Sequence, residues 1–168
     1  KRKLPYSVAL IGNHEQRIER ALNIQPELEG TISYRDLDLE RYYDEVVHYD
    51  GSTPGSIKID GIVYAHYITS GVLGRPLSRT RMGSALIDEC HVSTTVGHRH
   101  TFDYAIGRAA GGRKLHGLCC GVLQEHNSPF AGKAQELWWK GVIIKRNVSE
   151  GDYDIQLVSM AELEKEYA

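Results

Sequence analysis

Short apolar runs that end at turns rich in glycine or histidine recur along this chain and limit the folds open to it. The first run, residues 6–11, ends at Gly12, and apolar residues at helical spacing follow over 15–24. A later pair of runs, 56–59 and 62–66, is joined by Asp60-Gly61, a dipeptide typical of two-residue hairpin turns. The pattern therefore predicts an α/β fold that is built from short strands.

The rest of the chain continues this pattern with few helices. Segment 34–49 is expected to form a short helix that leads into a strand, and 82–89 is expected to form a helix. Further strands are predicted over 91–97, 101–106, 115–123, 137–146 and 153–159, before a closing helix over 160–167. The chain has 168 residues and no repeat or linker, so we expect a single domain over 1–168.

Composition excludes some classes of protein and leaves others open. Hydrophobic residues make up 41% of the chain and charged residues 25%, and no apolar run approaches the length of a membrane span. A formal net charge of -2 gives no global field that would favour a nucleic acid or a membrane. The three cysteines have no zinc or redox spacing, so we expect reduced core residues in a cytoplasmic protein without a membrane partner.

Polar side chains suited to metal binding follow three of the predicted strands. Residues 13–14 are Asn-His, His66 ends the hairpin, and residues 98–100 are His-Arg-His. Strand ends of an α/β sheet can share one edge, where such folds place their sites. In an extended backbone, side chains two residues apart point the same way, so the histidines of 98–100 could each reach one metal of a close pair. Neutral imidazole and amide oxygen suit divalent Mn, Fe or Zn.

Three motifs built on these residues resemble those of the calcineurin-like metallophosphoesterases. Gly12-Asn13-His14-Glu15, Ala65-His66 with a glycine-rich loop after it, and Gly97-His98-Arg99-His100 are similar to the third, fourth and fifth family motifs, in the usual order. The first and last in combination are specific, whereas either alone is a weak signal. The resemblance covers nearly the whole chain. Within the family, the chain is similar to phage-encoded or bacterial members.

The resemblance implies a four-layer α/β/β/α sandwich with mixed sheets and a two-metal site at the strand ends. Asn13, His66 and His98 would bind one metal, and His100 the other. The divalent ion would be Mn, Fe, Zn or Ni, with two ions in the complete family site and one in a site of three ligands. A metal-bound water loses a proton near neutral pH and becomes the nucleophile.

The resemblance also implies roles around the substrate. His14 would approach the phosphate and protonate the leaving oxygen, with Glu15 as a candidate to orient it. From the sequence itself, Arg75 and Arg99 are candidates for holding phosphate oxygens, against the alternative of solvated turn charges. The expected activity is phosphodiester hydrolysis, with a nucleic acid or nucleotide as substrate. Phosphomonoester hydrolysis, including that of phosphoproteins, stays open.

The chain departs from the family at its start. The first two family motifs, Asp-x-His and Gly-Asp, normally precede Gly12, yet only eleven residues do so here and none is Asp or His. We therefore expect an N-terminal half that was removed by truncation, cleavage or gene splitting, or that another chain supplies. Asp36, Asp88 and Asp103 could replace the missing aspartates, although surface roles are favoured for them.

Two alternatives to catalysis by this chain remain. One is a catalytically incomplete domain that binds a metal or a partner without turnover. The other is a plain α/β module whose histidines are structural. The pair Trp138-Trp139 falls in the strand predicted over 137–146, which favours packing in the core over base stacking.

Overall fold

A computed structural model describes residues 5–167, except for the side chain of Phe130. It shows a mixed α/β protein with several small sheets and few helices. The chain divides into two compact units, Lys1–Ile57 and Lys58–Ala168, and each is described by itself. None of the helices within 5–167 has the length and apolar character needed to cross a lipid bilayer.

The first unit is a pair of parallel strands joined by helices. β1 (Val8–Leu10) pairs with β2 (Glu45–Val47), and the Ser7 amide and hydroxyl both donate to the Asp44 carboxylate, at 2.7 and 2.8 Å. Four helical segments lie between the strands: α1 (Gln16–Ile24), η1 (Pro26–Leu28), η2 (Tyr34–Leu37) and α2 (Leu39–Tyr42). The strand and helix predicted over 6–24, and the helix and strand predicted over 34–49, are confirmed.

The second unit contains a five-stranded mixed sheet in the order β3-β4-β7-β9-β8. β4, β7 and β9 run parallel to one another, whereas β8 is antiparallel to β9. The strands are β3 (Ser56–Ile59), β4 (Ile62–Ala65), β7 (Thr94–Val96), β8 (Phe102–Arg108) and β9 (Lys114–Cys120). The predicted turn between β3 and β4 is present, and both of its residues have the positive φ that a type I′ turn requires: Asp60 at 49° and Gly61 at 83°. A small hairpin, β5 (Thr69–Ser70) with β6 (Arg75–Pro76), follows β4.

One face of this sheet packs against α3 (Met82–Cys90), which ends within one residue of its prediction. Leu86 of the helix and Val96 and Cys119 of the sheet are almost fully buried in one apolar cluster. The helix lies so close to the sheet that a Cβ added to Gly117 would stand 1.8 Å from the Gly83 carbonyl oxygen. The contact between helix and sheet therefore depends on two glycines.

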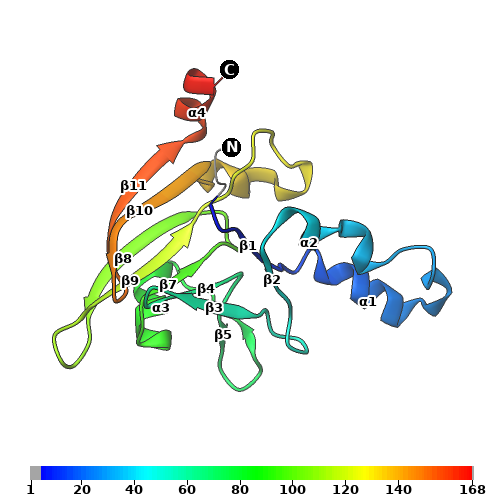
Figure 1. Cartoon of the computed structure of the whole chain (residues 1–168), viewed down its shortest axis with the longest axis horizontal. Coiled ribbons are helices and arrows are strands. Elements are labelled where there is room, and N and C mark those ends of the chain that lie inside the picture. The colour runs from blue at the N-terminus through cyan, green and yellow to red at the C-terminus, as the bar shows by residue number, and fades with distance from the viewer. Residues whose placement is uncertain (1–4, 168) are drawn as a thin grey trace. The chain divides into compact units, whose positions relative to one another are not determined.

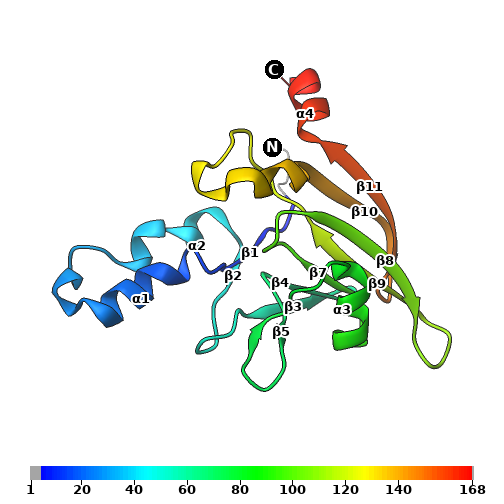
Figure 2. The same cartoon turned by 180° about the vertical axis from the view of Figure 1, so that it is seen from behind.

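The opposite face is covered by the long hairpin of β10 (Gly141–Ser149) and β11 (Asp152–Ser159). Figures 1 and 2 show the hairpin, orange to red, beside β8 and β9, with α4 (Met160–Tyr167) at its end. Tyr153 of β11 stacks on the buried His116 of β9, with ring centroids 4.3 Å apart. The Gly151 amide donates to the Asp60 carbonyl at 2.8 Å, which joins the hairpin's turn to the β3–β4 turn.

The strand prediction for Trp138 and Trp139 is wrong. The 3₁₀ segment η3 (Pro129–Leu137) runs up to Trp138, and β10 begins only at Gly141. Trp139 instead donates its amide to the His100 carbonyl at 3.1 Å and accepts from the Val122 amide at 2.9 Å. Its backbone is thus paired by segments distant in sequence. The ring of Trp139 lies against Phe102, in agreement with the expected packing role.

Asp103 has a structural task at the start of α3. Its carboxylate accepts the Gly83 amide at 2.7 Å, so it satisfies one of the amides that have no partner within the helix. We expect Asp103→Ala to lower the free energy of unfolding by about 1 to 2 kcal/mol. Asp88→Ala, an exposed position in the same helix, is the matched control and should change it by less than about 0.5 kcal/mol. If urea unfolding shows the same loss of unfolding free energy in both variants, Asp103 does not cap the helix.

Candidate functional site

His66 and His98 meet where two neighbouring parallel strands end. Ala65 and Val96 are the last register partners of β4 and β7, and His66 and His98 follow them by one and two residues. The His66 carbonyl accepts the amides of Gly97 and His98, at 3.2 and 3.1 Å. The parallel ladder therefore continues past the strand ends and fixes both histidine backbones.

The two imidazole rings are in direct contact. His66 Nε2 lies 3.1 Å from His98 Nδ1, and the ring centroids are 5.0 Å apart at an interplanar angle of 73°. The Tyr67 ring lies beside both, with centroids 5.7 Å from His66 and 5.1 Å from His98. A hydrogen bond between these two nitrogens requires a proton on one of them and a lone pair on the other.

The spacing of these nitrogens also fits a shared metal ion. Two nitrogen ligands with bonds of about 2.1 Å to one ion are about 3.0 to 3.4 Å apart for angles between 90° and 109°. The 3.1 Å separation between Nε2 of His66 and Nδ1 of His98 falls in this range. The pair can therefore supply two of the donors that a divalent ion needs.

His100 is placed differently from the expectation. Residues 97–100 form a turn in which the His100 amide donates to the Gly97 carbonyl at 3.2 Å, and His100 has a left-handed φ of 61°. The prediction of an extended backbone over 98–100 is wrong, because this turn replaces it. The His100 ring packs edge-on against Trp138, with centroids 4.3 Å apart at 87°.

Asn13, His14 and Glu15 lie in the first unit, in the turn between β1 and α1. Asn13 is half-buried and His14 is exposed. The Glu15 carboxylate accepts the Gly12 amide at 2.9 Å and so stabilises this turn. These three residues follow the end of β1, as the sequence predicts.

The two candidate arginines have different surroundings. Arg75 is exposed at the start of β6, in the hairpin that follows His66. Arg99 lies between His98 and His100, and its Nη1 donates to the Arg79 carbonyl at 2.6 Å. The same Nη1 lies 3.4 Å from the Ser78 hydroxyl, so the Arg99 guanidinium holds the loop that precedes α3.

Within residues 5–167, no three His, Cys, Asp or Glu side chains lie together in a way that would hold a metal ion. Of the aspartates considered as substitutes, Asp103 caps α3 and Asp36 accepts the Ser33 amide at 2.7 Å in the capping box of η2. Asp88 is exposed.

Sequence reasoning missed a buried polar network centred on His116, which is 1% exposed. Its Nδ1 lies 2.5 Å from the Tyr104 hydroxyl, and its Nε2 lies 2.7 Å from the Asp152 carboxylate. Hydrogen bonds from Lys114 and His116 hold the pKa of Asp152 below its usual value. The available signal was a histidine at a position of β9 that alternation places on a covered face.

Lys145 on β10 was also missed. Its Nζ donates to the Thr95 hydroxyl at 2.6 Å and lies 4.1 Å from the centroid of the Tyr64 ring. Burial lowers the pKa of this amine to about 7, and the nearby Cys120 acts in the opposite direction. The signal in the sequence was a lysine directly after the apolar run 142–144 of a predicted strand.

No known protein-family model, curated protein or solved structure matches this chain.

Proposed function

We propose that this chain forms part of a metal-dependent phosphoesterase, with one divalent ion held between His66 and His98. The observation that carries the proposal is the 3.1 Å contact between two imidazole nitrogens at the ends of neighbouring parallel strands. Motif likeness adds Asn13 as a third ligand and His100 as a ligand of a second ion. The four-layer sandwich that the motifs imply is part of the same proposal.

The ion would be Mn, Fe, Zn or Ni, and when bound it would acidify a water molecule to make a nucleophile for phosphorus. His66 and His98 would contribute neutral imidazole nitrogens, since protonated nitrogens cannot bind a cation. His14, exposed after β1, would donate a proton to the leaving oxygen, and Glu15 would hold the turn that carries it. Arg75 and Arg99 would bind phosphate oxygens.

The substrate class that we favour is a phosphodiester, either a nucleotide or a nucleic acid. One guanidinium group can donate two parallel hydrogen bonds to phosphate oxygens, which suits an anionic ester. Because the two motifs that carry the family's bridging aspartate are not in this sequence, we expect metal binding by the chain alone but slow turnover.

Metal binding is the first test of this proposal. We expect Zn²⁺ or Mn²⁺ to bind the chain by isothermal titration calorimetry and to raise its melting temperature. At a hundred times Kd the ion adds about 2.7 kcal/mol to the free energy of unfolding. For a chain of this size, that corresponds to about 5 to 10 °C.

The variant His66→Ala/His98→Ala should lose this binding. His126→Ala is the matched control, because His126 is exposed and lies outside the three motifs, and it should keep it. Equal binding by the double variant and the control would contradict the site, and no binding by any of the three proteins would assign the histidines a structural role.

Activity distinguishes an enzyme from a metal-binding domain without turnover. We expect Mn²⁺-dependent hydrolysis of bis(4-nitrophenyl) phosphate to rise at least tenfold when a segment carrying Asp-x-His and Gly-Asp is joined before Lys1. Metal binding without hydrolysis in both forms would support the incomplete domain instead. Hydrolysis of 4-nitrophenyl phosphate in preference to the diester would favour a phosphomonoesterase.

A further inference from the structure

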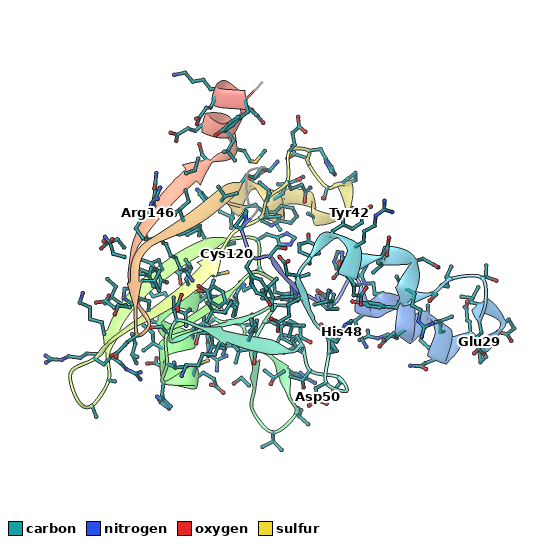
Figure 3. All side chains as sticks on the ribbon, in the orientation of Figure 1. Glu29, Tyr42, His48, Asp50, Cys120 and Arg146 are labelled. Atoms are coloured by element: carbon teal, nitrogen blue, oxygen red, sulfur yellow. The ribbon has the colours of Figure 1, made fainter. Side chains whose placement is uncertain are left out.

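A cavity lies between the sheet of the second unit and the β10–β11 hairpin, on the face away from α3. Its volume is about 440 Å³, within the range of small-molecule sites. Tyr64, Thr95 and Leu118 are register partners on three neighbouring strands, so their side chains share the face that lines it. Figure 3 shows Cys120 at the end of β9, two residues beyond Leu118 and also in the lining.

The lining is mostly apolar and contains one cationic group, Lys145. Gly141 and Ile143 precede it at alternate positions of β10 and line the same cavity. The amine of Lys145 is held at Thr95, and Tyr64 and Tyr153 present their rings 4.1 and 4.7 Å from Nζ. No carboxylate in residues 5–167 forms an ion pair with it.

We propose that Lys145 is a nucleophilic amine that captures apolar aldehydes in this cavity as an imine. The carbon and hydrogen atoms of such a ligand would pack against Leu118 and Ile143, while the carbonyl carbon meets Nζ. This activity is independent of the phosphoesterase proposed above, because its residues lie outside the three motifs.

The reaction balances without an oxidant or reductant. The lone pair of Nζ attacks the carbonyl carbon, the π electrons of C=O move to oxygen, and that oxygen takes a proton. The resulting carbinolamine loses water and forms C=N, so amine and aldehyde give imine and water. The Thr95 hydroxyl, 2.6 Å from Nζ, is placed to pass the proton from nitrogen to oxygen.

Burial favours the neutral, reactive amine of Lys145 and disfavours the thiolate of Cys120, the other nucleophile in the cavity. With a pKa of about 7, about half of the Lys145 amines are neutral at pH 7, compared with about one in 2,500 for a lysine with a pKa of 10.4. Burial raises the pKa of the Cys120 thiol to about 11, so Cys120 stays protonated and is a poor nucleophile there. The other titratable groups facing Lys145, Tyr64 and Tyr153, also have raised pKa values because of burial and stay neutral.

Reductive trapping tests the proposal on the whole chain. The protein is treated at pH 7 with benzaldehyde and sodium cyanoborohydride, and the modified lysine is located by peptide mass spectrometry. We expect modification at Lys145 to be at least tenfold faster than at any other lysine, with a rate that rises through pH 7. Glyoxylate, which carries a carboxylate, should be captured at least tenfold more slowly at this position.

Three variants complete the test. Lys145→Arg keeps the positive charge but cannot form an imine, so the fast modification seen in the wild type should be lost. Lys133→Met, at an exposed lysine, is the control and should retain fast modification at Lys145. Thr95→Val keeps the shape of the side chain and should slow trapping at Lys145 about tenfold. If the wild-type protein is instead modified at its lysines in proportion to their exposure, the proposal is overturned. This outcome needs no variant to be seen.

Discussion

Replacing Gly117 with alanine is expected to lower the free energy of unfolding by about 3 kcal/mol or more. The new Cβ would stand 1.8 Å from the Gly83 carbonyl oxygen and 2.7 Å from its carbonyl carbon. Both atoms belong to the backbone of α3, so no side chain can rotate away and the helix must leave the sheet. Overpacking of this kind costs about 1 to 3 kcal/mol where neighbours can shift, and more where they cannot. Urea unfolding followed by tryptophan fluorescence measures the loss.

Gly97→Ala is the matched control for this substitution. A Cβ at Gly97 would meet only the Cys120 sulfur, at 3.7 Å, which is an ordinary contact, and its φ lies outside the left-handed region. We expect its free energy of unfolding to change by less than about 1 kcal/mol, since alanine also restricts the unfolded chain. Similar stabilities of Gly117→Ala and Gly97→Ala would show that α3 is not held at this distance.

The sequence predicted those elements whose signals are local. The Asp60-Gly61 turn was predictable because both positions need positive φ, and α4 was predictable because its apolar spacing follows a strand directly. The irregular pairing between Arg146 and Ser149 was not, since it rests on the left-handed φ of 52° at Asn147. β10 therefore runs three residues beyond its predicted end.

Contacts between distant segments account for the remaining misses. Trp139 is paired with His100 and Val122, and nothing in the residues around Trp139 indicates either partner. Lys145 is paired with Thr95, fifty positions earlier in the chain. By contrast, the contact of His66 with His98 could be expected, because each residue follows a strand and neighbouring parallel strands end at one edge.

The burial of Lys145 also predicts how stability depends on pH. In the folded chain the pKa of this amine is about 7, whereas in the unfolded chain a lysine has a pKa of about 10.4. Between these values the unfolded state binds more protons, so the free energy of unfolding rises with pH. Compared with Lys145→Met, the wild-type chain should gain up to about 1.4 kcal/mol per pH unit from pH 7 to pH 10. Below pH 7 the difference should be constant, because both states are then protonated.

Urea unfolding of the wild type and Lys145→Met between pH 6 and 9.5 measures this difference. Lys133→Met is the control, and its difference from the wild type should not change with pH, because Lys133 is exposed. The rings of Tyr64 and Tyr153 oppose the effect of burial, since an aromatic face attracts an ammonium group by about 0.5 to 2 kcal/mol. In Tyr64→Leu, the free energy of unfolding should therefore begin to rise at a lower pH than in the wild type. Parallel curves for the wild type and Lys145→Met would mean that the amine stays charged in the folded chain, and the same result would remove the reactive neutral lysine from the cavity.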